Sequence, residues 1–291
     1  MIDPNQVLKM IWLLFGAIAV TFCSMFGRVA HGYIPKGRVI LEKVGRQHGK
    51  GAYVIQQEVS FRDPSGNLTV IEDWVVENGE SIALDVRGGG QRASYVYKGK
   101  QKIFVDEMGT EKSAVLGADF FEPAFFYRGW ENLAEFLVKE KILTTKNIPR
   151  ENFKKDIKEY GYVPDSFVRL SRVSGVVAYA FGQPTPVDSS RALPGLWVEQ
   201  DRFLIRKIRL NSQAEVSADD YGEFSNGLWF PKSRTVAWGN QAVHLRVLKI
   251  SSTSLPPSIK ARLSPTGLRK RPDSKEQFTN PTVSEFYKRF R

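Results

Sequence analysis

The chain has 291 residues, 42% of them hydrophobic and 25% charged, with a formal net charge of +11. This composition is typical of a folded protein with one large domain or two small ones. The single cysteine, Cys23, excludes an intramolecular disulfide and a multi-cysteine zinc site. The positive charge favours acidic partners such as nucleic acid, anionic lipid headgroups or lipopolysaccharide phosphates, or it only keeps the protein soluble.

An uncharged, apolar stretch at residues 10–27 stands near the N-terminus. Such a stretch is typical of a signal peptide or of a membrane anchor. Ala30 and Gly32 fit a small-residue cleavage site, so that a mature chain would begin at Tyr33. Residues 1–32 are therefore interpreted as either a signal peptide or a membrane anchor of a protein in the periplasm of a Gram-negative cell; an anchor that is kept would tether the protein to the inner membrane.

The first third of the body alternates between apolar and polar residues, which predicts half-buried strands joined by tight turns. A short amphipathic helix at residues 37–47, with Ile40, Leu41 and Val44 facing inward, precedes them. The predicted strands are residues 53–62, 68–76, 82–86, 93–97 and 101–106.

The middle of the chain changes to a helical period. Between Phe120 and Ile142, the apolar residues Trp130, Leu133 and Leu137 share one helix face. A second short helix is predicted over residues 149–161, because Pro149 suits its first turn and Gly161 its end.

Strand patterns return in the second half and predict a continuation of one antiparallel sheet. They cover residues 166–172, 176–181, 196–199, 203–210, 229–238 and 242–250. No parallel βαβ repeat is visible, so residues 33–250 are interpreted as a single domain.

Residues 251–291 are rich in Ser, Pro and basic residues, with nine Lys or Arg against three Asp or Glu, a net charge of +6. This composition predicts a mobile tail, in which residues 281–290 form a short helix with Val283, Phe286 and Tyr287 inward. The tail is either an ordinary solvated terminus or a segment that binds an anionic membrane surface.

Motifs of catalysis are missing from the sequence, which contains no G-x-S-x-G, no H-E-x-x-H and no P-loop. The neighbouring carboxylates Glu72 and Asp73 would face opposite sides of a strand, and the glycines at 88–90 support phosphate binding only weakly. We expect no enzyme, no cofactor and no metal site.

Three stretches resemble LolA-like proteins, the superfamily of outer-membrane lipoprotein-sorting proteins that includes LolA, LolB and RseB. LWVEQDRFLIRKIRL (196–210) is similar to a strand pair of that family, DYGEFSNGLWFPKSRTV (220–236) to its next segment, and residues 37–61 to its opening helix and first strand. The resemblance implies an α+β, mainly β fold, in which a curved antiparallel sheet forms an incomplete β-barrel capped by helices. It also implies a concave cavity that binds acyl chains, although the carriers' gating arginine has no matching position.

The expected function is a periplasmic carrier that holds lipid acyl chains or lipoprotein in an apolar cavity, loosely plugged by the helix at 120–137. Each buried methylene would contribute roughly 0.8 kcal/mol, so that binding needs no catalytic group. The candidate lining residues, each of which also suits an ordinary core, are Trp74, Phe104, Phe121, Phe125, Trp130 and Trp197.

The sequence leaves two other hypotheses open. A scaffold or an RseB-like regulatory module would use the same sheet to bind a partner protein of the envelope, and a retained anchor and basic tail favour it. An enzyme acting on envelope polymers would require carboxylates that converge in a cleft. No nucleic acid partner is expected.

Overall fold

The computed structural model describes residues 34–63, 66–79, 81–143, 168–271 and 274–291. Within these ranges, Pro35–Arg291 form one compact unit. The expected leader over 1–32 and the expected helix over 149–161 lie outside the described residues. No helix in the described part of the chain is long and apolar enough to cross a membrane.

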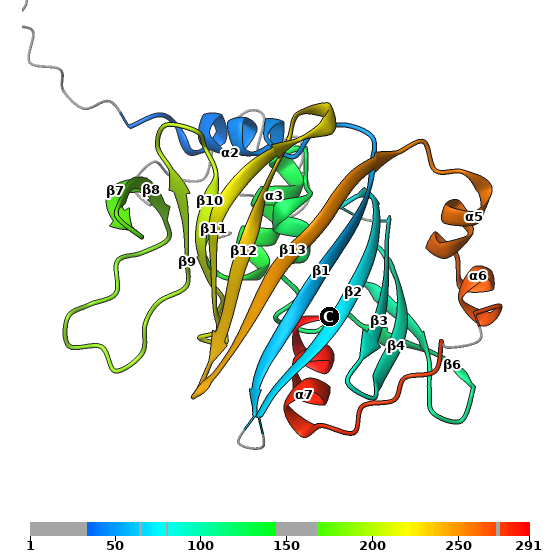
Figure 1. Ribbon diagram of the computed structural model, residues 1–291. Helices are drawn as coiled ribbons and strands as arrows, with labels where there is room; N and C mark the ends of the chain where they lie inside the picture. Colours follow the sequence, from blue (N-terminus) through cyan, green and yellow to red (C-terminus); the bar gives the residue numbers. More distant parts are fainter. Residues whose placement is uncertain (1–33, 64–65, 80, 144–167, 272–273) are drawn as a thin grey trace, which may run out of the picture. The chain divides into compact units, whose positions relative to one another are not determined.

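A 13-stranded antiparallel sheet dominates the unit, with the strand order β6-β5-β4-β3-β2-β1-β13-β12-β11-β10-β9-β8-β7 (Figure 1). Its first six strands are β1 (Ala52–Asp63), β2 (Gly66–Asn78), β3 (Ser81–Gly88), β4 (Gln91–Lys98), β5 (Gln101–Val105) and β6 (Glu111–Val115). Its other seven strands are β7 (Val168–Val173), β8 (Val176–Phe181), β9 (Gly195–Glu199), β10 (Ile205–Arg209), β11 (Glu215–Phe224), β12 (Leu228–Trp238) and β13 (Gln241–Thr253).

Two meanders make up this sheet, one from β1 to β6 and one from β7 to β13, and they join where β1 pairs with β13. The strands β6 and β7 end the order, so the sheet is curved but not closed. The mainly β, open-barrel fold expected from the sequence is confirmed.

Alternation along the strands decides which residues enter the core. On β1, the apolar residues Tyr53, Ile55 and Phe61 are buried on the inner face of the sheet, as predicted. The same inward positions also include polar residues, because Gln57 and its cross-strand partner Glu72 on β2 are buried as well. Polar groups in such positions need partners inside the protein.

Helices cover both faces of the sheet (Figure 1). They are α2 (Gly37–Arg46), η1 (Glu122–Phe125), α3 (Trp130–Lys139), η5 (Ser225–Gly227), α5 (Pro257–Lys260), η6 (Ala261–Leu263), α6 (Pro265–Arg269) and α7 (Pro281–Phe290). The predicted helix at 37–47 is confirmed, with its three apolar residues buried. The predicted helix between Phe120 and Ile142 is two pieces, the turn η1 and the helix α3, with Gly129 in extended conformation between them.

Strands β6 and β11 were not predicted from the sequence. The β11 segment, EVSADDYGEF, mixes small, acidic and glycine residues, and its alternation stops at Asp219, where two exposed carboxylates follow each other. Strand β6 is short and mostly exposed. Hydrogen bonding to the neighbouring strands determines the extended conformation of both segments more than their own side chains do, as is common for β-structure.

The expectation of a mobile tail over 251–291 is wrong for its described residues. Strand β13 continues to Thr253, and α6 buries Leu268 against Val96 and Val105 on the outer face of the sheet. The chain then crosses β4, where Arg92 and Gln277 exchange backbone hydrogen bonds of 3.0 and 2.8 Å. We call residues 257–271 and 274–280 the strap.

Helix α7 follows the strap and lies on the inner face, as the red helix below β1 and β2 in Figure 1. Its formation at 281–290 is confirmed: Pro281 occupies the first turn and Asn280 Oδ1 accepts a hydrogen bond of 3.1 Å from the Val283 amide. The average composition of the segment indicated a mobile tail, but the apolar residues of this helix recur with helical spacing and so can be buried together.

Candidate functional site

The inner face of the curved sheet forms a hollow, and α7 occupies it. The apolar side of this helix consists of Val283, Phe286, Tyr287 and Phe290, and each of these residues has 0% of its surface exposed. An amphipathic helix buries its apolar stripe against another apolar surface, and here that surface is the aromatic lining of the sheet.

Aromatic contacts connect α7 to both meanders. The Phe286 ring meets Phe61 of β1 edge-on with centroids 5.4 Å apart, and the Phe290 ring lies 5.0 Å from Trp238 of β12. Tyr287 stacks on Tyr95 of β4 at 6.4 Å. Pairs of this geometry contribute about 0.5–1.5 kcal/mol each beyond the burial of their area. Because the contacts reach β1 and β4 of one meander and β12 of the other, α7 bridges the two halves of the sheet.

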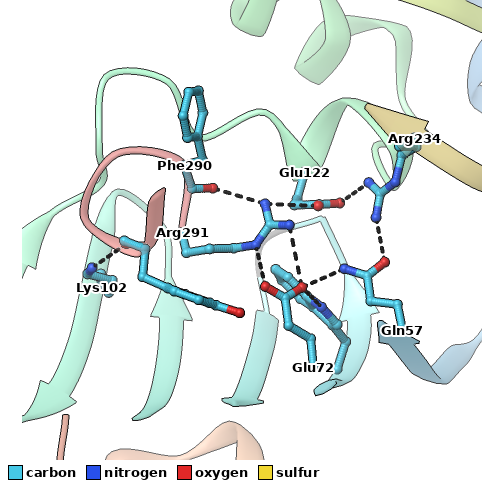
Figure 2. Close-up of polar contacts among 9 residues, drawn as sticks. Gln57, Glu72, Lys102, Glu122, Arg234, Phe290 and Arg291 are labelled. Atoms are coloured by element: carbon cyan, nitrogen blue, oxygen red, sulfur yellow. Dashed lines mark hydrogen bonds and ion pairs between the residues drawn. The ribbon is translucent and has the colours of Figure 1, made fainter. Parts of the chain in front are cut away.

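Charged side chains meet at the end of α7 in a fully buried network, which Figure 2 shows. Arg291 Nε lies 3.0 Å from Glu72 Oε1 on β2, and its Nη1 lies 3.0 Å from Glu122 Oε1 in η1. Arg234 on β12 donates to the other oxygen of Glu122 at 2.5 Å and to Gln57 Oε1 at 2.7 Å. We call these five residues the buried charge network.

Two guanidinium groups balance two carboxylates in this network. Burial by itself raises the pKa of Glu72, but the charge of Arg291 and hydrogen bonds from Arg291, Gln57 and Trp74 bring the pKa below its usual value. The pKa of Arg291 lies above its usual value because both carboxylates oppose the effect of burial. Both partners of this pair are therefore charged, and losing Arg291 would leave Glu72 without a counter-charge.

Further polar contacts fix α7 along its length. Lys102 Nζ donates to the Tyr287 carbonyl oxygen at 3.3 Å, and Trp238 Nε1 donates to Glu285 Oε1 at 2.8 Å. Arg289 pairs with Asp119, which precedes η1. The pKa of Lys102 is lowered by burial, an effect that the charge of Glu276 opposes. Helix α7 is thus held by both apolar and charged contacts.

Three of the six candidate lining residues converge around the buried charge network. The Arg291 guanidinium lies 5.1 Å from the Trp74 ring centroid and 5.4 Å from that of Phe121. Phe125 meets Phe121 edge-on at 6.3 Å and lies 5.2 Å from the Arg234 guanidinium. These three side chains line the inner hollow between the sheet and η1.

The other three candidates lie elsewhere. Phe104 is half-buried on β5, with its ring 6.3 Å from Tyr95. Trp130 begins α3 and lies beneath Arg38 of α2 at 5.0 Å. Trp197 is placed on the outer face of β9, because its neighbours Leu196 and Val198 occupy the inward positions and side chains alternate along a strand.

The buried charge network was missed by sequence reasoning, although part of it left a signal. Glu72 shares the inward positions of β2 with Val70 and Trp74. Arg234 likewise shares the inward positions of β12 with Val236. A charged residue at an inward position indicates a buried partner. Arg291 has no such local pattern.

A second buried polar contact lies at the end of α2. His48 Nδ1 is 2.6 Å from the Tyr127 carbonyl oxygen, and an imidazole can make this contact only as a donor. Burial lowers the pKa of His48 to about 4, against a small opposing effect of this hydrogen bond. The neutral ring ties α2 to the segment between η1 and α3.

The carboxylates of the inner face converge, but on arginine. Glu72 and Glu122 both pair with Arg291, and both are buried beneath α7. Asp73 faces the outer side of β2 and pairs with Arg87 at 2.8 Å, as the alternation of the strand predicts. In this arrangement the charged groups connect the end of α7 to the sheet and to η1.

Comparisons with known proteins give likenesses of fold. No protein-family model matches the sequence, and no curated protein matches it. A LolA superfamily protein from Nitrosomonas europaea is similar in structure, with a TM-score of 0.48 and 10% identity over 78% of this chain and 97% of that one.

Two further solved structures are similar. An outer membrane lipoprotein-sorting protein domain from Vibrio parahaemolyticus has a TM-score of 0.45 and 9% identity over 75% of this chain and 92% of its own. A DUF1329 family protein from Desulfovibrio piger has a TM-score of 0.43 and 11% identity over 76% and 95%.

Proposed function

We propose that this protein is a non-catalytic binding protein of the cell envelope, which holds the acyl chains of lipid or lipoprotein in the hollow that α7 occupies. One observation carries the proposal: the part of the hollow next to Phe61, Tyr95 and Trp238 is covered by an amphipathic helix at the end of a strap. Displacing that helix would open an aromatic surface formed by both meanders.

Helix α7 and a long acyl chain would gain comparable free energy by being buried in the hollow. Burying four apolar side chains of α7 contributes roughly 6–12 kcal/mol, at about 1.5–3 kcal/mol for each side chain. An acyl chain that buries about a dozen methylenes would contribute roughly 10 kcal/mol. A long acyl chain can therefore compete with α7, whereas a short one cannot.

Opening the hollow also separates charges. Without Arg291, Glu122 would keep the guanidinium of Arg234, whereas Glu72 would keep only its hydrogen bonds from Gln57 and Trp74. Breaking a buried pair by removing one partner costs about 3–5 kcal/mol. We infer that loading is slow unless a donor protein or membrane stabilises the open form, as suits a carrier that exchanges cargo between partners. The apolar segment at 10–27 supports a place in the periplasm.

Binding of a fluorescent long-chain fatty acid to the full chain tests the proposal. We expect the double variant Phe286→Ser/Phe290→Ser, in which α7 is loosened, to bind the probe more tightly than the wild-type protein does. The matched control is Trp197→Ser, which removes an aromatic ring from the outer face and should leave binding unchanged. Failure of both the wild type and the loosened variant to bind the probe saturably would refute the proposal.

The alternative function is a scaffold or regulatory module that binds an envelope protein. The observation that favours it is the filled hollow itself, since every apolar residue of α7 is already buried. In that case lipid would bind neither the wild type nor the loosened variant. The wild-type protein would instead bind an envelope protein while α7 stays in the hollow.

A further inference from the structure

The outer face of the sheet carries two cavities on either side of one arginine, Arg271 of the strap. The first, of about 570 Å³, is lined by Asp85, Val86, Arg87, Gly88, Gly90, Gln91, Arg92, Ser94, Arg271 and Gln277. The second, of about 470 Å³, is lined by Val105, Gly109, Glu111, Arg269, Arg271, Ser274 and Lys275. A side chain that borders both cavities can serve a ligand that extends from one into the other.

Positive charge is in excess in the first cavity. Its described lining holds one carboxylate, Asp85, against three guanidinium groups, those of Arg87, Arg92 and Arg271, an excess of two. The second cavity has the same excess. A concave surface with charge of one sign concentrates ligands of the opposite sign.

Two of these arginines stand directly opposite each other in the β3–β4 ladder, where Arg87 pairs in register with Arg92. Like charges in directly opposed positions destabilise a sheet; Asp73 offsets this for Arg87 by pairing with it at 2.8 Å, and both guanidinium groups remain on the cavity lining. The turn between them is formed by Gly88, Gly89 and Gly90, all with positive φ, and open space lies beside Gly90. The turn therefore leaves its backbone accessible at the cavity.

The single carboxylate of the first cavity is already fully engaged. Asp85 accepts hydrogen bonds from Ser94 at 2.7 Å and from Arg262 at 2.5 Å, and it also pairs with Arg271. Arg271 in turn donates to the Arg262 carbonyl oxygen at 2.6 Å. Asp85 thus fixes the position of Arg271, while the carboxylate that pairs with Arg87 is Asp73 of β2, which is not part of the cavity lining.

We propose that the first cavity binds the phosphate group of an anionic lipid headgroup. Guanidinium groups bind phosphate through paired, charge-assisted hydrogen bonds, and here two strands and the strap would supply them together. The site lies on the outer face of the sheet, whereas the acyl-chain hollow lies on the inner face. Each proposal can therefore fail without the other.

Calorimetric titration of the full chain with a short-chain phosphatidylglycerol, below its micelle concentration, tests the site. The test variant is Arg87→Gln/Arg92→Gln, whose exposed side chains line the cavity. We expect it to weaken binding at least roughly tenfold, because each charged hydrogen bond lost contributes on that scale. Short-chain phosphatidylcholine, which carries no net charge, should bind the wild type more weakly.

The matched control is Lys232→Gln/Arg246→Gln, which removes two exposed positive charges from β12 and β13. Each of these side chains, like Arg87, has a carboxylate partner in the structure. The control should bind the lipid as the wild type does. Equal losses in both variants, or no binding by the wild type, would overturn the proposal. Inorganic phosphate that binds where phosphatidylglycerol does not would assign the site to free phosphate and overturn the lipid assignment.

Discussion

Two arginines and two glutamates share the buried space between the sheet and its inner helices. Arg291, which directly follows α7, contacts both carboxylates. Buried pairs stabilise a fold little compared with well-packed apolar residues, but they make the loss of either partner costly. The network therefore specifies where α7 docks more than it strengthens the fold.

A double-mutant cycle tests this coupling. Arg291→Leu should lower the free energy of unfolding by about 3–5 kcal/mol, because Glu72 and Glu122 lose a shared counter-charge. Adding Glu72→Gln should recover part of the loss, since one buried carboxylate is then neutral and Glu122 retains Arg234. Urea unfolding of the wild type, both single variants and the double variant measures the coupling. Strictly additive losses would contradict a direct interaction between Arg291 and Glu72.

His48 predicts a pH dependence of stability. Its pKa falls from 6.5 to about 4 on folding because burial disfavours the charged ring. The unfolded chain therefore binds the proton more readily, so the contribution is complete above pH 6.5 and is lost as the pH falls towards 4. The loss amounts to at most about 3 kcal/mol.

Unfolding free energies measured between pH 7 and pH 5 check this expectation, with His48→Asn as the variant that cannot titrate. Its stability should change less with pH than that of the wild type. Glu72 does not interfere in this window, because its folded-state pKa lies below 4.5 and its contribution is lost only in stronger acid. Identical pH profiles for the two proteins would show that His48 is not the titrating group.

At the scale of elements, the sequence predicted strands and helices correctly wherever apolar side chains repeat with a regular period. The strand over 53–62 and the helix over 37–47 were predicted because their apolar residues repeat with a period of two and of 3.6. Strand β11 was not predicted, since its two adjacent acidic residues and a glycine break that repeat. Pairing with β10 and β12 decides its conformation, and such long-range partners are invisible to a local pattern.

Helix α7 shows the same limit for the candidate site. Its three inward residues were predicted from their spacing, but its position on the inner face depends on the strap, which first crosses the outer face and then β4. Trp74, Phe121 and Phe125 were proposed as lining residues from aromatic character alone, and they lie together around the buried charge network. Trp197 was included by the same reasoning although it lies on the outer face, because aromatic character does not reveal which face of a strand a residue occupies.

At the scale of the whole described unit, the C-terminal segment wraps around one meander. Helices α5 and α6 lie against the outer face, where Arg262 binds Asp85, and α7 lies against the inner face. An element that leaves the hollow can thus remain tethered by the strap. The proposed acyl-chain site and the proposed phosphate site would then occupy opposite faces of the same strands.

Hydrogen exchange of the α7 amides, residues 283–290, with and without a long-chain fatty acid, tests the central claim most directly. If acyl chains replace α7 in the hollow, these amides should exchange faster when the fatty acid is bound, while the amides of β1 and β13 remain protected. Unchanged or stronger protection of α7 in the fatty-acid complex would contradict the account.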